Sequence, residues 1–551
     1  MSTANHTPKR IEIYDTTLRD GSQGQGVTFS LVEKIQIAQH LDTLGVDFIE
    51  GGFPLSNPKD EAFFRETATI SFEHARICAF GMTHRKGLVP EDDPGMKALV
   101  AANADLITIV GKSWDLHVVE VLRVETQENL EMIRDSVAFC RKQSGRPIFY
   151  DAEHFFDGFR HHRDYALSTI KAALDGGAER MILCDTNGGS LPGWIASVLT
   201  KVRQELGPQV KLGIHTHNDC NLGVANTLAA VEAGAMQVQG TINGIGERCG
   251  NADLTSIIAN LKLKMGCDCL NKGALSQLTH TSRFIYELAN LNRVANQPFV
   301  GSGAFAHKGG MHVHAVQRVS RSYEHVEPES VGNSRSVLVS ELSGASNITA
   351  TLGQKFDIAD DKVLQRKILQ KVQDLEHRGY QFEAAEASFE LLLHRLLGTR
   401  PEFWKLDHYR CVILKTDGDA PVTEAIVKLL LGAAEEHHVA DGDGPVHALD
   451  GALRKCLVSH YPAIREVHLS DYKVRVVNPT AESAAKVRVI AEFAICHNGD
   501  HSQPKRHFAT IGVNENIVDA SWQALADAFT YHLIEVGQKN AHVTTATSPK
   551  N

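Results

Sequence analysis

The sequence predicts a (β/α)8 TIM barrel in residues 1–285, a mostly helical linker region in 286–402 and a C-terminal α+β domain in 403–540. Eight short apolar, β-branched runs alternate with helical stretches in the first part of the chain. The runs occupy residues 11–18, 46–52, 75–81, 106–111, 147–153, 180–186, 211–217 and 237–244. A doubly wound open sheet is the alternative, but no G-x-G-x-x-G motif follows the first run.

The segments between the runs have the apolar spacing of amphipathic helices. In residues 30–45, SLVEKIQIAQHLDTLG, apolar side chains recur at helical intervals, and Gly45 is placed to cap the end of the helix. Residues 191–207 and 222–235 follow the same pattern. These helices complete the alternation that a barrel requires.

Polar side chains gather at the carboxyl ends of the predicted strands. In a barrel these ends converge on one face, where the active sites of this fold lie. None of the eight runs ends in a lysine, so we expect no Schiff-base chemistry. The polar residues are Arg19, Asp20, Glu50, Thr83, His84, Glu153, His154, Asp185, Thr186, Asn187, His215, His217 and Asn243.

The stretch GIHTHNDCN, residues 213–221, places two histidines two positions apart. In a strand, His215 and His217 leave from the same face and can close on one ion. The alternative is a polar strand end whose imidazoles hydrogen-bond to a loop.

The alternation stops beyond residue 285. Residues 299–317 are rich in glycine and histidine and are predicted to form a loop over a site. Residues 403–540 alternate strands and helices in a new pattern, in which His437 and His438 are expected on a solvated helix face. The polar tail, 541–551, is predicted to be disordered.

The composition excludes several classes of function. The 551 residues carry a net charge of −10, which gives no electrostatic footprint for nucleic acid or an anionic membrane. No apolar run approaches the length of a membrane span. The ten cysteines are scattered and lack zinc-finger spacing, so free thiols in a reducing cytoplasm are expected.

Four motifs, in this order, resemble the family of the 2-isopropylmalate, homocitrate and citramalate synthases: DTTLRDG (15–21), CDTNGG (184–189), HTHND (215–219) and GERCGNADL (246–254). The resemblance covers nearly the whole chain. Residues 20–30, 51–60 and 150–159 resemble the citramalate synthase branch, in which the 2-oxo acid is pyruvate. The alternative is a larger 2-oxo acid, as in the 2-isopropylmalate and homocitrate synthases.

The resemblance implies a metal-dependent Claisen condensation on a TIM barrel. It assigns a divalent cation, Mn²⁺, Mg²⁺ or Zn²⁺, to Asp20, His215, His217 and Asn251. A 2-oxo acid would chelate this cation through its ketone and carboxylate oxygens. Arg19 resembles the catalytic arginine of the family, and the resemblance implies that it also contacts the substrate.

The second substrate that the resemblance implies is acetyl-CoA, whose methyl group must lose a proton to a positioned base. Glu153, His312 and Tyr323 match residues that the family uses at its site, and the sequence leaves open which of them is the base. His312 and Tyr323 lie outside the barrel, so they would have to cover it, from the same or a partner subunit. Thr186 is expected to contact the carboxylate of the 2-oxo acid.

The C-terminal domain resembles the regulatory domain of the family, which pairs in a homodimer and binds an end-product amino acid. Gly442 and Gly444 lie in its glycine-rich turn, and Pro445 is expected at the first position of the next helix, whose N–H groups suit a carboxylate. Isoleucine or leucine is the expected effector. A barrel that only binds an amino acid, without catalysis, is the alternative from another class.

Overall fold

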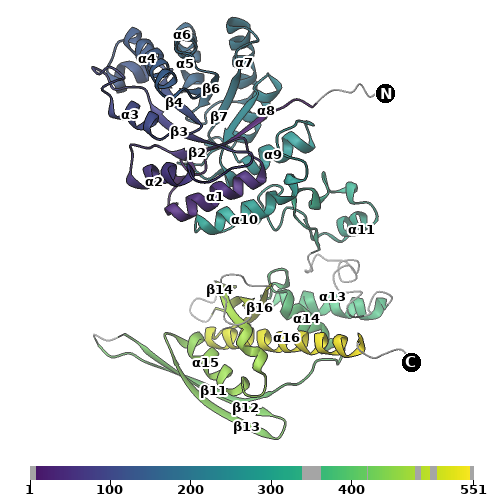
Figure 1. The fold of residues 1–551 in the computed structure, drawn as a ribbon. Helices are drawn as coiled ribbons and strands as arrows, with labels where there is room; N and C mark the ends of the chain where they lie inside the picture. Colours follow the sequence, from purple (N-terminus) through teal and green to yellow (C-terminus); the bar gives the residue numbers. More distant parts are fainter. Residues whose placement is uncertain are drawn as a thin grey trace. The chain divides into compact units, whose positions relative to one another are not determined.

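The computed structural model describes residues 8–337, 356, 361–417, 420–477, 485–496 and 506–546. The chain forms two compact units, which are shown in Figure 1. The first contains Met1–Ala306 and Glu324–Ser336, and the second contains His307–Tyr323 and Val337–Asn551.

The first unit contains a closed barrel of eight parallel strands, in which β8 pairs with β1. This confirms the predicted fold class. The strands are β1 (Glu12–Asp15), β2 (Phe48–Gly52), β3 (Arg76–Met82), β4 (Leu106–Lys112), β5 (Ile148–Glu153), β6 (Arg180–Asp185), β7 (Leu212–Thr216) and β8 (Gln237–Gly240).

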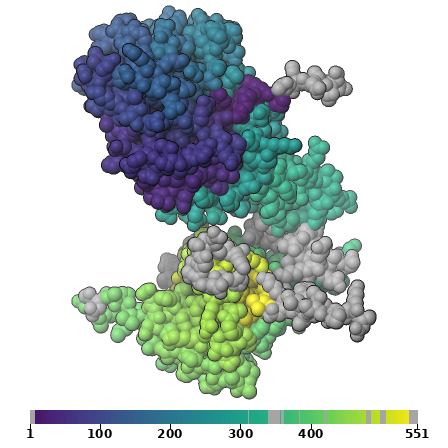
Figure 2. Space-filling view, in the orientation of Figure 1, coloured from purple at the N-terminus to yellow at the C-terminus, as the bar shows by residue number. Residues whose placement is uncertain are grey.

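Helices surround the barrel and follow its strands in the chain (Figure 1). In the space-filling view the residues of this unit, purple to teal, form a continuous surface (Figure 2). The helices are α1 (Leu31–Leu44), α2 (Pro58–Thr67), α3 (Pro94–Ala101), α4 (Thr126–Ser144), α5 (Phe155–His161), α6 (Arg163–Gly176), α7 (Pro192–Leu206), α8 (Gly223–Glu232), α9 (Leu254–Leu263) and α10 (Leu278–Leu288). The short helices are η1 (Gly21–Gln23), η2 (His117–Leu122), η3 (Ile242–Gly244), η4 (Ala274–Gln277) and η6 (Pro328–Val331).

Local sequence signals explain where α1 begins and ends. Ser30 is its N-cap and accepts a hydrogen bond from Glu33 N at 3.3 Å, while Glu33 accepts from Ser30 N at 2.7 Å. This reciprocal capping box satisfies two free backbone donors. Gly45 ends the helix with φ of 86°, a left-handed conformation that favours glycine, as predicted.

The barrel has two apolar cores. The larger one lies between the strands and the helices and includes Ile13, Ile37 and Leu199. The smaller one fills the barrel interior with side chains from six strands: Tyr14, Phe48, Cys78, Leu106, Phe149, Ile182 and Cys184. Alternate positions of each strand face inward, so the next inward residues of each strand lie closer to the carboxyl end of the barrel.

The second unit contains two antiparallel sheets, β11-β12-β13 and β14-β15-β16, as the sequence predicts for a separate α+β domain. Helix α15 packs on the first sheet and α16 on the second. The elements are α11 (Gly310–Arg318), α13 (Lys362–His377), α14 (Glu386–Leu396), β11 (Lys405–Leu414), β12 (Val422–Leu431), β13 (Ala434–Gly442), α15 (Pro445–Leu457), β14 (Val467–Val476), β15 (Val487–Ile495), β16 (Arg506–Asn514) and α16 (Ile517–Ala546). Shorter pieces are η5 (Ser320–Ser322), η7 (Phe382–Ala384) and η8 (Pro462–Glu466), and strands β9 (Ala306–His307) and β10 (Ser336–Val337) lie where the chain passes between the units.

Three local predictions in this part of the chain are wrong. His437 and His438 lie on strand β13, not on a helix, because this segment pairs with β12 along its full length. Residues 310–318 form helix α11, where a loop was expected. Helix α16 continues to Ala546 and so includes 541–546 of the predicted tail; residues 547–551 lie outside the described residues.

Among the helices that the structure describes, none is long and apolar enough to span a membrane. All ten cysteines are free thiols, and five of them are buried in the two apolar cores of the barrel, including Cys78 and Cys184 in the barrel interior.

Candidate active site

The structure brings Asp20, His215, His217 and Asn251 together at the carboxyl end of the barrel. Asp20 follows β1, and its backbone N–H donates to Thr16 O at 2.9 Å in the turn before η1. His215 lies on β7, and His217 follows that strand and forms an antiparallel bridge with Asn251. All four side chains are buried.

The polar atoms of this cluster face one another. His215 Nε2 lies 3.2 Å from His217 Nε2, and Asp20 Oδ2 lies 3.2 Å and 3.9 Å from the same two nitrogens. Asn251 Nδ2 lies 2.7 Å from Asp20 Oδ2. One ligand atom from each of Asp20, His215 and His217 lies within 4.8 Å of the others, a separation that a single cation can span.

Two further observations fit a cation at this position. Asn251 Oδ1 is buried without a hydrogen-bond partner among the described residues. The oxygen and nitrogen of an amide group are similar in size. A half-turn of the Asn251 amide would therefore fit the same space and point its oxygen toward the cluster. Burial, with His215 close by, lowers the pKa of His217 to about 3, so this ring is neutral, as a metal ligand must be.

The carboxyl of Asp20 is held ionised. Burial alone would raise its pKa, but the Arg19 guanidinium and the two imidazoles outweigh burial and hold the pKa well below its ordinary value. An ionised carboxylate beside two imidazole nitrogens is a donor set of the kind that holds a divalent cation.

Arg19 is fixed by three contacts beside the cluster. Its Nη1 lies 3.1 Å from Asp20 Oδ1, its Nε pairs with Glu50 Oε1, and its guanidinium carbon lies 3.9 Å from the centroid of the Phe80 ring. Glu50 is completely buried and also accepts from Tyr14 Oη at 2.7 Å. The guanidinium plane is therefore set before any substrate arrives.

A chain of hydrogen bonds to Gln239 and Asp151 in the barrel interior orients the ring of His215. His215 Nδ1 lies 2.9 Å from Gln239 Oε1, and Gln239 Nε2 donates to Asp151 Oδ1 at 3.3 Å. When the amide oxygen of Gln239 accepts, Nδ1 carries the proton and Nε2 presents its lone pair to the cluster. Burial, followed by the nearby Glu50, raises the pKa of Asp151 to about 7.

Glu153 is the last residue of β5, and Lys112, the last residue of β4, forms an ion pair with it. The prediction that no strand ends in a lysine is therefore wrong. The predicted run stopped at Gly111, whereas the pairing of β4 with β5 continues through Lys112 and Glu153. The amine of Lys112 forms an ion pair with the carboxylate of Glu153.

Thr186 follows β6, and its hydroxyl oxygen accepts from His154 N at 2.8 Å. The hydroxyl hydrogen is left to donate to a further acceptor. Thr186 is half-buried at the same end of the barrel as Glu153 and the four-residue cluster.

Four other predicted site residues belong to the second unit. His312 lies on α11 and stacks on Tyr323, with ring centroids 4.1 Å apart. Their closure over the barrel stays a prediction. Gly442 ends β13 and Gly444 is the N-cap of α15, whose first residue is Pro445, as predicted.

The structure adds Gln239 and Lys112 to the site and shows what Glu50, already expected at this face, contacts. Glu50 and Gln239 each face inward from a barrel strand, and Lys112 ends one. A polar residue at an inward position of an apolar strand is the signal that could have found Gln239. Their partners come from other strands, so only the closed barrel shows what they contact.

A pocket of about 540 Å³ opens beside this end of the barrel. Its lining is largely apolar, with Phe53, Leu55, Met82 and Leu122, and Arg85 and Lys86 add positive charge. Strand alternation places Met82 on the same face of β3 as Phe80, which contacts Arg19.

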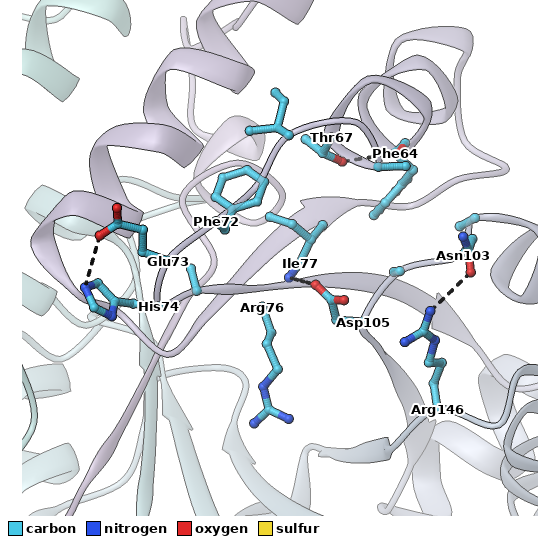
Figure 3. A pocket seen from close by; sticks show the side chains of 15 residues that line it. Phe64, Thr67, Phe72, Glu73, His74, Arg76, Ile77, Asn103, Asp105 and Arg146 are labelled. Carbon is cyan, nitrogen blue, oxygen red and sulfur yellow. Dashed lines mark hydrogen bonds and ion pairs between the residues drawn. The ribbon is translucent and has the colours of Figure 1, made fainter.

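Another pocket, of about 430 Å³, lies at the opposite end of the barrel, where the chain enters β3, β4 and β5 (Figure 3). Arg146 donates to Asn103 Oδ1 at 3.4 Å, and Ile77 N donates to Asp105 Oδ2 at 2.9 Å. These contacts join the loops that lead into the strands. This pocket is separate from the cluster of Asp20 and the two histidines.

Three family models match successive parts of the chain. The HMGL-like family model matches residues 10–285, the homocitrate synthase post-HMGL domain-like model matches 299–379, and the LeuA allosteric (dimerisation) domain model matches 383–533. A solved HMG-CoA lyase from Brucella melitensis is 20% identical, with a TM-score of 0.44, over 51% of this chain and 99% of its own.

Two curated relatives match along almost their whole lengths. The (R)-citramalate synthase of Geobacter sulfurreducens is 49% identical over 95% of this chain and 97% of its own. That of Aquifex aeolicus is 46% identical over 96% of this chain and 98% of its own. The chain therefore belongs to the HMGL-like barrel enzymes and, within them, to the family of the (R)-citramalate synthases.

Proposed function

We propose that the protein condenses acetyl-CoA with pyruvate and releases (R)-citramalate and CoA. The observation that supports this best is the convergence of Asp20, His215 and His217 beside the fixed guanidinium of Arg19. A divalent cation, Mn²⁺, Mg²⁺ or Zn²⁺, held by these three residues and Asn251 would polarise the ketone and offset the negative charge that forms on its oxygen.

The residues of the chain perform the remaining tasks. Arg19 adds a fixed positive charge near the developing oxyanion, and Thr186 donates its hydroxyl hydrogen to the carboxylate of the 2-oxo acid. Glu153, which forms an ion pair with Lys112, would activate the acetyl methyl group. His312 and Tyr323 are the other candidates for the base, supplied by the second unit of this or a partner subunit.

The reaction balances with one water. The methyl group of acetyl-CoA loses a proton to the base, and its carbon forms a bond with the ketone carbon of pyruvate. The ketone oxygen takes up a proton and becomes the tertiary hydroxyl. Water then cleaves the thioester, which gives a carboxylate and free CoA thiol.

The pocket of about 540 Å³ suits the CoA arm. Its apolar wall fits the pantetheine chain, and Arg85 and Lys86 suit the phosphate groups. We infer that acetyl-CoA enters over the ends of β2, β3 and β4 and brings its thioester toward Glu153.

We also propose that the chain works as a homodimer in the cytoplasm, in isoleucine biosynthesis, with 403–540 as its regulatory domain. The match to the LeuA allosteric (dimerisation) domain supports this assignment. Isoleucine is the expected effector, and leucine is the effector if the substrate is 2-oxoisovalerate.

The test measures CoA thiol released from acetyl-CoA with pyruvate, 2-oxoisovalerate or 2-oxoglutarate. We expect pyruvate to give the highest kcat/KM and His217→Ala to give none. Discrimination by one methylene or branch is worth only about 1–3 kcal/mol, so all three substrates are needed. Equal or faster turnover with 2-oxoisovalerate or 2-oxoglutarate would reassign the enzyme to 2-isopropylmalate or homocitrate synthesis.

A further inference from the structure

A second group of potential metal ligands lies next to the proposed active site. His117, Glu153 and His154 each offer one ligand atom, and these atoms lie within 4.8 Å of one another. His117 comes from η2, after β4, while Glu153 and His154 follow one another at the end of β5. We propose that these three side chains form a second cation site, distinct from Asp20, His215 and His217, that takes a transition metal such as Zn²⁺ or Co²⁺.

His117 is prepared to act as a ligand. Its Nδ1 is buried and has no hydrogen-bond partner among the described residues, which is costly for a polar atom unless something binds it. Burial, together with His154, lowers its pKa, so the ring is neutral. It stacks on Trp114 at 5.4 Å and belongs to a π-helix, an uncommon conformation that occurs often at functional sites.

The backbone of His154 has an uncommon conformation, and hydrogen bonds fix the position of its ring. Its φ of 55° and ψ of 32° place it in the left-handed region, and its N–H donates to Thr186 Oγ1. Its Nδ1 lies 3.0 Å from Asp157 Oδ2, which also accepts from Asn187 Nδ2 at 3.0 Å. A carboxylate that holds one ring nitrogen while the other faces a metal is the usual support for a ligating histidine.

Glu153 completes the donor set. Lys112 engages its Oε2, and Oε1 is the oxygen left for a cation. Two imidazoles and one carboxylate favour Zn²⁺ or Co²⁺ over Mg²⁺, which prefers oxygen ligands. Tetrahedral coordination needs ligand atoms roughly 3.4 Å apart, so small side-chain rotations would close the site.

The ammonium group of Lys112 repels a cation at this site. Binding of a metal ion should therefore disturb the ion pair between Lys112 and Glu153. A metal ion bound to Glu153 competes with Lys112 for the carboxylate. If Glu153 activates the acetyl group, as the proposed function holds, occupation of the second site slows condensation. The site would therefore make the enzyme sensitive to zinc.

The binding test uses the full-length, metal-depleted protein, titrated with Co²⁺ and followed by calorimetry and visible absorption. We expect two tight equivalents for the wild type, and one each for His117→Phe and Asp20→Ala. Phenylalanine keeps the stacking on Trp114 but removes the nitrogen. His161→Phe is the matched control, because His161 stacks on the same indole at 5.4 Å but is outside the ligand group, and it should bind two equivalents.

His154→Asn is the second variant, since asparagine tolerates the left-handed conformation, and it should also bind one equivalent. Two equivalents in His117→Phe and His154→Asn, or only one in the wild type, would overturn the proposal. In a second measurement, Zn²⁺ is added to condensation assays that contain Mg²⁺. At least tenfold more Zn²⁺ should be needed to inhibit His117→Phe than His161→Phe, and equal sensitivity would refute the zinc effect. If no variant condenses the substrates, the proposed function fails while the binding result stands.

Discussion

At the scale of single residues, the shape of the Arg19 side chain matters as well as its charge. Its guanidinium contacts Asp20 and Glu50, and its central carbon lies over the ring of Phe80. A planar group with several donors can make these contacts at once, whereas an ammonium is a point charge on a flexible chain.

We therefore expect Arg19→Lys to lower kcat by about 10²-fold or more, the size of effect seen when an oxyanion contact is lost. Binding of the cation should change little, because Asp20 and both histidines remain. Steady-state kinetics and metal analysis of the same preparation measure the two effects. A kcat within threefold of wild type would make Arg19 a residue that only supports the loop.

Asp15 gives a pH-dependent prediction away from the reacting groups. Burial raises its pKa to about 7, although two hydrogen bonds from Thr17 oppose the rise. The folded state therefore holds this proton more tightly than the unfolded state. Its stabilising contribution is complete below pH 4 and is lost as the pH rises toward 7.

Asp15→Asn removes this titration while keeping an acceptor for Thr17 N. The free energy of unfolding of the variant should match wild type near pH 4 and exceed it by up to roughly 4 kcal/mol above pH 7. Urea unfolding of the barrel at several pH values measures the difference, with exposed Asp92→Asn as a control. A gap that does not grow between pH 4 and 7 would contradict the prediction.

At the scale of elements, periodicity predicted where strands and helices lie better than where they end. Strand β4 runs one residue beyond its predicted run, and that residue is Lys112. Helix η2 was not predicted either. It is a π-helix of six residues, which is too short for a recognisable spacing of apolar side chains. The histidine pair at 215 and 217 was easier, because its spacing fixes a shared face in any strand.

The junction of β13 and α15 offers a prediction about regulation. A Cβ at Gly442 would lie 2.4 Å from Ala448 N, while a Cβ at Gly444 would meet nothing within 4 Å. Gly442→Ala must therefore shift the start of α15, and Gly444→Ala need not.

We expect Gly442→Ala to raise the inhibitory concentration of isoleucine at least tenfold, with kcat within about twofold of wild type, and Gly444→Ala to behave like wild type. Titration of isoleucine and leucine against the three proteins tests this. Unchanged inhibition in Gly442→Ala would place the effector elsewhere.

For the whole molecule, the barrel could be predicted from its alternating pattern, but the partners of the middle helices could not. The helical pattern of α13 and α14 shows that they have apolar faces without showing what covers them. In the structure Ala387 and Leu391 of α14 share a core with β12, α15 and α16. Ile368 of α13 shares another with Ile511 and Val513 of β16.

This packing predicts how the chain tolerates truncation. A chain that ends at residue 400 keeps α13 and α14 but loses the strands and helices that cover them, so it exposes apolar surface. A chain that ends at residue 336 loses both helices. Size-exclusion chromatography with light scattering should show aggregation of the longer chain and a uniform species for the shorter one. A monodisperse chain 1–400 would show that α13 and α14 are stable without the C-terminal sheets.

The apolar layer inside the barrel separates the two ends of the barrel interior. Tyr14, Phe48 and Phe149 close the lumen beneath Glu50 and Asp151, and on its far side Arg180 pairs with Glu12. The three rings are almost completely buried, so we expect little passage of water or ions through this layer. Protons that reach Asp151 must therefore travel through the mouth of the barrel. If substrates fill that mouth, as the proposed function holds, we expect the carboxyl of Asp151 to keep one protonation state throughout a turnover.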